Sequence, residues 1–269
     1  MGGFIYNGKS TKNILSDELM LATFDDNVVI PEINRSLLAS DRTILKNIQN
    51  EYGTTYDNLT ISYGLVKKNG NKFTDDEQEC IEAWLTSPKL SLDLEIYDDQ
   101  NNVIEIYCGL FTNMKWQSVG ESWIGLMFEF TCNSAYGKKY FKETFNITSS
   151  QTLLINNPSD ELEEYVYPTI TLLQSSDTVQ NINLNNVSDN NKAMSVQVKK
   201  NMKTIIDCQH CIIQDQVGLI TNEDLGWNDV GNIYWLRLLP GDNQIQVNGN
   251  ASITIEFEYP CKKIGGWRL

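Results

Sequence analysis

The residues of this chain best suited to chemistry form the stretch Cys208-Gln209-His210-Cys211. A CxxC turn can present two thiolates to zinc and His210 would add a third ligand, but a structural zinc site needs four, usually from a second such turn. The sequence holds no second CxxC, and Cys261 would have to arrive alone from a distant strand. No βαβ pattern surrounds the cysteines, so a thioredoxin-like role is not indicated. We interpret the stretch as a hairpin turn with incidental cysteines and predict no metal ligands.

His210 is the single histidine, so Ser–His–Asp and Cys–His catalysis would both have to use it. The sequence contains neither a Gly-x-Ser-x-Gly elbow nor a papain-type cysteine box. It also lacks GxGxxG and Walker A sequences, so nucleotide chemistry has no support. The 35 carboxylates leave a glycosidase pair open, but no spacing selects one. We therefore predict no catalytic and no cofactor-binding residues, and a protein that is not an enzyme.

Two oxygen-rich stretches, residues 98–102 and 188–191, are candidates for calcium binding. Neither fits the spacing of an EF-hand loop. Asx-rich turns between strands explain both without a metal, because Asn and Asp side chains bond their own backbone and tolerate positive φ. We predict turns at both places.

Tryptophans offer a further kind of site, a platform on which sugars stack. In β-sandwiches single tryptophans are more often core or subunit-contact residues. We interpret five tryptophans of this chain as core or subunit-contact residues: Trp116, Trp123, Trp227, Trp235 and Trp267.

The bulk composition narrows the function classes. A chain of 269 residues, 41% of them hydrophobic, can build two domains of ordinary size or one large β domain. Its net charge of −14 repels phosphate backbones, which argues against nucleic-acid binding. No apolar run approaches the ~20 residues of a membrane span, and residues 1–10 lack the features of a secretory signal. We expect a protein that folds in a cytoplasm, with its six cysteines reduced.

One helix is predicted with clear start and stop signals. Thr74 and Glu77 fit a capping box, in which each side chain bonds a free N–H near the helix start. The carboxylates of the first turn also suit the positive end of the helix dipole. Apolar residues from Cys80 to Leu85 fall on one face, and Pro88 ends the helix.

The rest of the first half reads as strands. Phe4–Tyr6 and a turn at Asn7-Gly8 predict a first strand, residues 27–48 a long loop or arm, and residues 54–67 another strand. After the helix the apolar period changes to two, which is typical of half-buried strands. This pattern predicts a meander of three strands whose buried sides are Leu90, Leu92, Leu94 and Ile96, then Ile104, Ile106, Cys108 and Leu110, then Ile124, Leu126, Phe128, Phe130 and Cys132.

A domain boundary is predicted within residues 133–150, where the alternation is lost and small and charged residues gather. Beyond it, short strands recur with Asn-, Asp- and Ser-rich turns between them, and no helix is indicated. This spacing favours a β-sandwich. The expected strands are residues 153–155, 165–173, 182–184, 194–198 and 203–208.

The last strands, within residues 235–259, are connected by turns whose residue types indicate the type of turn. Pro240-Gly241 suits a type II turn, because Pro presets φ and Gly accepts a positive one. Asn248-Gly249 is the strongest short hairpin signal, since a type I′ turn needs positive φ at both central positions. The alternation from Ile253 to Tyr259 predicts a closing strand with one buried face.

Four stretches together resemble the siphophage distal tail protein (Dit) family. The opening FIYNGKST at residues 4–11, the helix exit W-L-x-x-P-x-L at residues 84–90 and the Pro-Gly-Asp-Asn turn at residues 240–243 are similar to that family. Residues 123–136 resemble the end of its first domain, with Ala135 where Pro is usual. The galectin sugar motif His-x-Asn-Pro-Arg is absent, because His210 is followed by Cys-Ile-Ile.

The resemblance implies a mainly β fold of two domains. A tail-tube-like domain, β-sandwich or barrel-like with one helix, would cover residues 1–145 and form a ring. A galectin-like β-sandwich would cover residues 146–269 and project outward. In some members the chain end returns to the first domain, and residues 260–269, with Trp267 as an anchor, are a candidate for this course.

As a function, the resemblance implies a virion protein made in the bacterial cytoplasm. It would form a hexameric hub ring at the tail tip or baseplate, join the tail tube protein to the tail-tip hub protein, and display receptor-binding proteins for host attachment. The alternative is a carbohydrate-binding adhesin module that recognises host wall polysaccharide. A wall glycosidase is a third, weaker interpretation.

Overall fold

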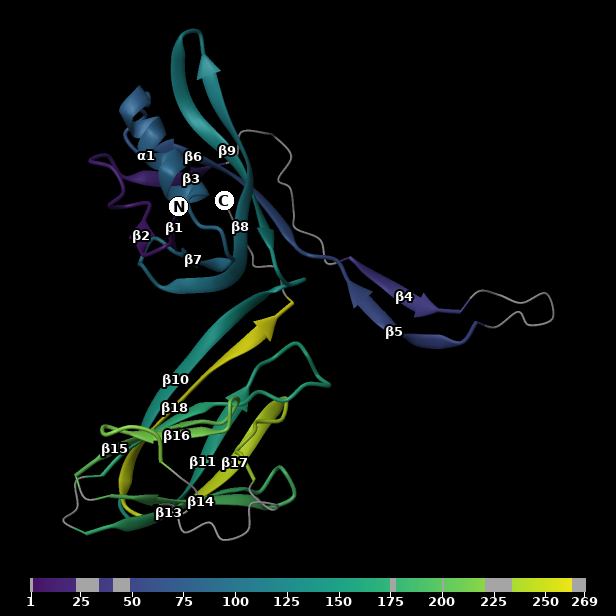
Figure 1. Ribbon diagram of the computed structural model, residues 1–269, viewed down its shortest axis with the longest axis vertical. Helices are drawn as coiled ribbons and strands as arrows, with labels where there is room; N and C mark the ends of the chain where they lie inside the picture. Colours follow the sequence, from purple (N-terminus) through teal and green to yellow (C-terminus); the bar gives the residue numbers. More distant parts are fainter. Residues whose placement is uncertain are drawn as a thin grey trace. The chain divides into compact units, whose positions relative to one another are not determined.

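The computed structural model describes residues 2–22, 34–40, 49–174, 178–199, 201–220 and 234–262 (Figure 1). It contains β-strands and, within these ranges, one α-helix. Two compact units are present. Unit 1 spans residues 1–138 and takes in the chain again from Cys261, and unit 2 is Lys139–Pro260. Each unit has a buried apolar cluster of its own. The predicted fold class, mainly β with one helix and two domains, is confirmed.

Unit 1 is built on one antiparallel sheet in the order β2-β1-β7-β8-β9-β6-β3. Its end strands β2 and β3 do not pair with each other within the described ranges, so the sheet is not a closed barrel. The strands are β1 (Gly3–Tyr6), β2 (Lys9–Ser10), β3 (Leu19–Ala22), β6 (Thr60–Lys67), β7 (Leu92–Tyr97), β8 (Val103–Val119) and β9 (Ser122–Cys132).

The helix α1 (Asp75–Thr86) is confirmed with its predicted cap. The Thr74 hydroxyl accepts a hydrogen bond from the Glu77 N–H, and the Glu77 carboxylate accepts one from the Thr74 N–H at 2.8 Å. The helix buries Ile81, Trp84 and Leu85 against the core of unit 1. Trp84 stacks on Phe4 with ring centroids 5.3 Å apart and donates its indole N–H to the Tyr6 carbonyl. The helix is thereby tied to the first strand.

The predicted buried side of β8 is confirmed only at Ile106, which is buried, and is wrong at its other positions. Tyr107 and Phe111 join the core cluster, whereas Ile104 is exposed and Cys108 and Leu110 are half-buried. Residues 104–111 are apolar on both faces of the strand, so alternation alone did not fix its phase. The aromatic rings bury more apolar area than the aliphatic side chains and take the inner positions.

The predicted strand over residues 54–67 is in fact two strands. The chain forms β5 (Glu51–Tyr56) and then β6, and β5 pairs with β4 (Arg35–Ala39) in a two-stranded sheet separate from the main one. Of this hairpin, only β4 falls in the region predicted as a long loop or arm, residues 27–48. Residues 27–33 and 41–48 of that prediction lie outside the described residues.

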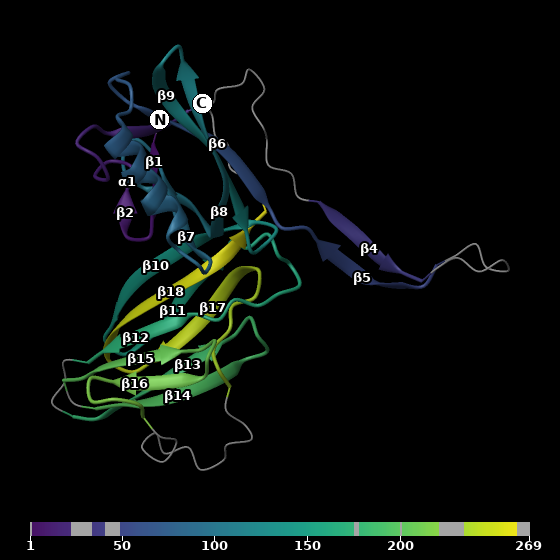
Figure 2. The same cartoon turned by 45° about the horizontal axis from the view of Figure 1, so that its top comes forward.

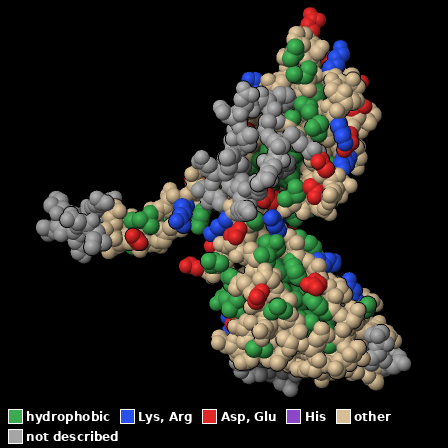
Figure 3. All heavy atoms as spheres, turned by 180° about the vertical axis from the view of Figure 1, so that it is seen from behind, with side chains coloured by type: hydrophobic (Ala, Val, Ile, Leu, Met, Phe, Trp, Pro, Cys, Tyr) green, Lys and Arg blue, Asp and Glu red, His purple; other side chains and the backbone are tan. Residues whose placement is uncertain are grey.

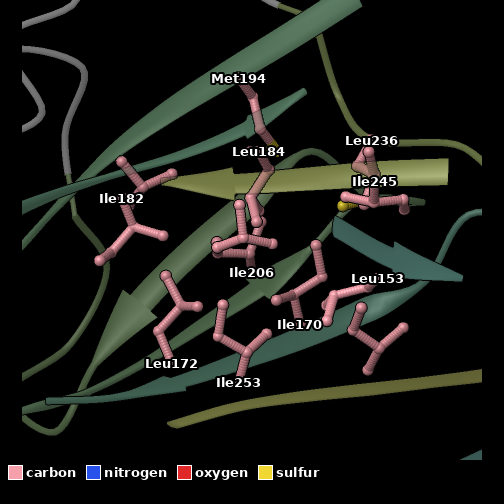
Figure 4. Packing of buried hydrophobic residues seen from close by; sticks show 14 of the residues in the cluster. Leu153, Ile170, Leu172, Ile182, Leu184, Met194, Ile206, Leu236, Ile245 and Ile253 are labelled. Atoms are coloured by element: carbon pink, nitrogen blue, oxygen red, sulfur yellow. The ribbon is translucent and has the colours of Figure 1, made fainter. Parts of the chain in front are cut away.

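Unit 2 consists of two antiparallel sheets that enclose one core (Figure 2). The first, β16-β15-β12-β18-β10, and the second, β11-β17-β13-β14, both contribute to the apolar cluster, in which Ile170, Leu172 and Ile253 of the first face Leu153 and Leu184 of the second (Figure 4). The strands are β10 (Gly137–Ile147), β11 (Ser150–Asn157), β12 (Thr169–Leu173), β13 (Gln180–Asn186), β14 (Lys192–Val198), β15 (Lys203–Asp207), β16 (Ile212–Asp215), β17 (Gly241–Asn248) and β18 (Ala251–Cys261).

Two sequence-based expectations for unit 2 need correction. Residues 137–147, within the stretch 133–150 where the alternation is lost and we assign no strand, form β10. Asn248-Gly249 does not close a hairpin, because β17 pairs with β11 and β13 whereas β18 pairs with β12 and β10. Only Gly249 has a positive φ, 138°, so the turn is not type I′. It carries the chain from one sheet to the other, because both strands are held by partners far away in the sequence.

The Pro240-Gly241 turn is confirmed, with φ of 85° at Gly241 as a type II turn requires. The buried Asn243 side chain holds this turn from inside. Its Oδ1 accepts from the Leu239 N–H at 2.9 Å, and its Nδ2 donates to the carbonyls of Leu239 at 2.7 Å and Gly241 at 3.0 Å. Polar backbone groups next to the core are thereby satisfied.

Candidate functional site

The first candidate site is the hairpin β4–β5 of unit 1. Its strands pair in register from Arg35 opposite Tyr56 to Ala39 opposite Glu51, with an irregularity after Leu38. The residues of its two strands are exposed except the half-buried Ala39 and Tyr56. A lone two-stranded hairpin is at best marginally stable in water, so this one needs a covering surface that the described parts of the chain do not supply.

Apolar side chains stand on both faces of this hairpin. Leu37 is 53% exposed and Leu38 47%, and because they are neighbours in a strand they point to opposite faces. Tyr52 on the facing strand is 69% exposed. In Figure 3 hydrophobic side chains are visible at its surface beside charged ones. Exposed apolar groups collected on a projecting element are typical of a protein–protein contact.

The chain returns to unit 1 after β18. The Lys262 ammonium lies 5.3 Å from the centre of the Tyr56 ring and 5.7 Å from that of Tyr136. Both rings belong to unit 1. The continuation to Trp267, which we expected to act as an anchor, lies outside the described residues.

The second candidate site contains the Cys208–Cys211 stretch, which is the predicted hairpin turn, between β15 and β16, with Asp207 opposite Ile212. Cys208 is buried, and burial raises the pKa of its thiol, whereas Cys211 is exposed and has a positive φ of 58°. Cys261 belongs to unit 1. Across the described ranges, no group of three or more Cys, His, Asp or Glu side chains is arranged to hold a metal.

His210 is fixed in this turn by Asp207. The carboxylate accepts from the backbone N–H groups of Gln209 and His210, and the His210 Nδ1 lies 2.8 Å from Oδ2. Burial opposes ionisation of Asp207, but these bonds hold its pKa below the usual range. In the neutral imidazole Nδ1 then carries the proton and Nε2 is an acceptor.

Beside this turn unit 2 contains a hollow of ≈ 420 Å³. It lies on the outer face of the β16-β15-β12-β18-β10 sheet, where Glu256 and Glu258 alternate with the buried Ile255 and Phe257. We call it the tyrosine hollow and define it by six of its lining residues: Tyr140, Tyr165, Tyr167, Gln209, His210 and Glu256.

A buried ion pair supports one wall of the tyrosine hollow. The Arg237 guanidinium lies over the Tyr165 ring, 3.9 Å from its centre. Arg237 is held in turn by two hydrogen bonds to Asp189, whose Oδ2 also accepts from the Tyr234 hydroxyl at 3.0 Å. The Arg237 hydrogen bond is the main cause that lowers the pKa of Asp189.

The other predicted turns and the described tryptophans are not among the residues that line the tyrosine hollow. Residues 98–102 turn between β7 and β8, where Asp98 bonds the N–H groups of Gln100 and Asn102, and residues 188–191 turn between β13 and β14. Trp116 packs on the core of unit 1 and Trp235 on that of unit 2, as expected of core residues. Trp123 is 37% exposed on β9. Trp227 and Trp267 lie outside the described residues.

Sequence reasoning missed the three tyrosines. Tyr165-Val166-Tyr167 carried a usable signal, because residues two apart in extended backbone point the same way, here with Val166 buried between them. The position of Tyr140 close to them carried no sequence signal, since it depends on the pairing of β10 with β18, a strand more than a hundred residues later in the chain. That pairing brings the Tyr140 hydroxyl 2.6 Å from Glu256.

The fold defines the class of protein. The chain resembles the crystal structure of the SPP1 Dit (gp 19.1) protein with a TM-score of 0.62, over 97% of this chain and 99% of that one, at 12% identity. A chain of the phage P2 baseplate in its activated conformation with calcium gives a TM-score of 0.50, over 97% and 99%, at 8% identity. These likenesses show a shared fold, that of Dit and baseplate proteins. Comparison with curated protein sequences gives no match.

The sequence places the chain within this class. Residues 2–134 match the phage tail protein N-terminal domain and residues 135–257 the phage tail C-terminal domain. The chain belongs to this family of phage tail proteins. No helix within the described ranges is long and apolar enough to cross a membrane.

Proposed function

We propose that this tail protein is a hub ring of six copies at the distal end of a long-tailed phage, a structural and not an enzymatic component. It joins the tail tube protein to the tail-tip hub protein, and unit 2, a galectin-like sandwich, displays receptor-binding proteins. The SPP1 Dit protein, whose fold is shared, is a paradigm of the hub adsorption apparatus in phages that infect Gram-positive bacteria. The proposed location is the virion, after synthesis in the host cytoplasm.

The observation that carries this proposal is the uncovered hairpin β4–β5. Leu37, Leu38 and Tyr52 expose apolar surface on an element that pairs with no other described strand. A second copy of the chain can cover it and offer its own hairpin onward, and repetition of such a head-to-tail contact closes a ring. Copies that each carry −14 repel one another, so moderate salt should favour assembly.

The test is the mass of the purified chain by light scattering after size exclusion, with negative-stain images of the same peak. A mass of six chains and a ring with a central lumen support the proposal. Leu37→Asp should shift the peak to smaller species, because a charge cannot be buried at an apolar contact without a partner. Leu162→Asp, at a leucine of unit 2 that is 75% exposed, is the matched control and should leave the ring intact.

A monomer that persists even when mixed with tail tube protein would overturn the ring. The alternative, an adhesin module that binds wall polysaccharide without ring assembly, would then account for the chain. If Leu37→Asp still forms rings, the hexamer is supported, but the hairpin β4–β5 is not the contact that holds it together.

A further inference from the structure

The tyrosine hollow has the size and lining of a ligand site, and neither the family match nor the hub proposal assigns it a role. Its ≈ 420 Å³ fall within the roughly 300–1,000 Å³ of small-molecule clefts. Three tyrosines line it, with Tyr140 50%, Tyr165 44% and Tyr167 39% exposed. Tyrosines half-open to solvent present an apolar ring face together with a polar tip.

Several polar atoms of the hollow have bonding capacity left. Both contacts of Glu256, from the Tyr140 hydroxyl and the Lys142 ammonium, reach Oε2, and no described donor reaches Oε1. The His210 Nε2 has no bond from the described residues, because Asp207 engages only Nδ1 and the backbone N–H. The Gln209 amide adds both a donor and an acceptor. Such a mixture matches hydroxyl groups, each of which donates and accepts.

The charges of the hollow decide between ligand classes. Three carboxylates line the hollow, Asp207, Glu256 and Glu258. Lys142 lies 2.9 Å from Glu256, and Asp207 bonds the His210 ring and two backbone N–H groups, so a strong cation would have to compete with the partners that these two carboxylates already have. The surplus of carboxylates over the whole chain disfavours phosphate-bearing polymers. A neutral, hydroxyl-rich ligand with an apolar face neither competes with the partners of the carboxylates, as a cation would, nor is repelled by them, as a phosphate would be.

The wall that would stack against a ligand is set before binding. Arg237, 3.9 Å from the Tyr165 ring centre, is held by the buried Asp189 carboxylate. Burial and the bond to Glu256 raise the pKa of Tyr140 to about 12, so its hydroxyl keeps that bond across the neutral range. A pre-formed wall reduces the ordering cost of binding.

We propose that the tyrosine hollow of unit 2 binds a neutral saccharide unit, stacked on tyrosine and hydrogen-bonded by Glu256, His210 and Gln209. The site lies at residues unrelated to the galectin motif, which this chain lacks. The proposal goes beyond the hub function and does not depend on the ring, because every lining residue belongs to unit 2.

The test uses the full chain on an array of bacterial surface saccharides, followed by titration calorimetry with the oligosaccharide that binds best. Poly(glycerol phosphate) and tetralysine serve as anionic and cationic probes. We expect binding of neutral glycans and of neither probe. Tyr165→Ala and, independently, His210→Ala should each weaken binding at least tenfold. Leu154→Ala, at a leucine on β11 that is 61% exposed and lines neither the hollow nor the hairpin β4–β5, is the control and should bind as the unmodified chain does.

Thermal unfolding and light scattering of each variant separate loss of the site from loss of fold or of ring. If Tyr165→Ala loses folding, His210→Ala, at a side chain 65% exposed, carries the test. Three results would overturn the proposal: no glycan bound, binding by both folded variants as strong as that of the unmodified chain, or binding of tetralysine in place of glycans. The last result would identify a basic protein segment as the partner.

Discussion

Arg237 and Asp189 form a two-bond ion pair inside unit 2, with Nε 2.7 Å from Oδ2 and Nη2 3.1 Å from Oδ1. The Asp189 side chain is 4% exposed and that of Arg237 22%. The pair links the turn after β13 to the segment that leads into β17, and it places the guanidinium over Tyr165. A contact between two parts of the sandwich thus also shapes the wall of the tyrosine hollow.

Loss of Asp189 should destabilise unit 2. Asp189→Ala leaves the Arg237 guanidinium without its main partner, and breaking a buried pair in this way costs about 3 kcal/mol. Urea unfolding followed by tryptophan fluorescence measures the change. Asp242→Ala, at an exposed aspartate whose side chain bonds Asn156 alone among the described residues, is the control and should stay within about 0.5 kcal/mol. Equal effects of the two variants would contradict a structural role for the pair.

Acid should unfold the chain through the same pair. Hydrogen bonds from Arg237 lower the pKa of Asp189, and those from Tyr140 and then Lys142 lower that of Glu256. With folded-state values below the unfolded ones, near 3.9 for Asp and 4.3 for Glu, the unfolded chain binds more protons in acid. This stability is therefore complete above about pH 5 and lost as pH falls through the lowered values. Melting temperatures between pH 2 and pH 7 should show this fall, with a shallower slope in Asp189→Asn.

The helix start was read correctly from a local signal, whereas the long-range strand pairing was not predicted. The cap of α1 was predictable because Thr74 and Glu77 lie three residues apart. The prediction of a hairpin at Asn248-Gly249 was wrong because the strands on either side of the turn, β17 and β18, pair with strands that are distant in the sequence. The residues of the tyrosine hollow show the same difference between local signals and long-range pairing. Tyr165 and Tyr167 carry a local signal, but their meeting with Tyr140 and Glu256 depends on the fold of unit 2.

Lys67 should contribute strongly to the stability of unit 1. Its ammonium, 4% exposed, bonds Glu77 at 2.7 Å at the start of α1 and Asp17 at 3.1 Å. Lys67→Met leaves both carboxylates without their cation, and we expect a loss of about 3 kcal/mol in unfolding free energy. Lys68→Met is a matched control, because Lys68 is 61% exposed and its pair with Glu18 is worth at most about 1 kcal/mol. Chemical denaturation of the two variants side by side decides; a larger effect at Lys68 would refute the assignment.

Asn243 should hold the Pro240-Gly241 turn. Asn243→Ala removes three side-chain bonds to the backbone of Leu239 and Gly241 and leaves buried polar groups unpaired, so we expect a loss of about 3 kcal/mol. Asn181→Ala, at an exposed position of β13, is the control and should change little. Hydrogen exchange of the β17 amides would report the same loss locally, and unchanged protection there would show that the backbone holds the turn without Asn243.

Thiol reactivity should separate the two cysteines of the β15–β16 turn. Burial raises the pKa of Cys208, and the pKa of the buried Cys132 to about 12, so both remain protonated and shielded at pH 8. Cys211 is exposed, and the thiolate is the reactive form. Brief treatment of the native chain with iodoacetamide, followed by peptide mass spectrometry, should therefore label Cys211 well before Cys208 and Cys132. Labelling in urea supplies the control, since all three should then react alike. Early labelling of Cys208 in the native chain would mean that the turn opens to solvent.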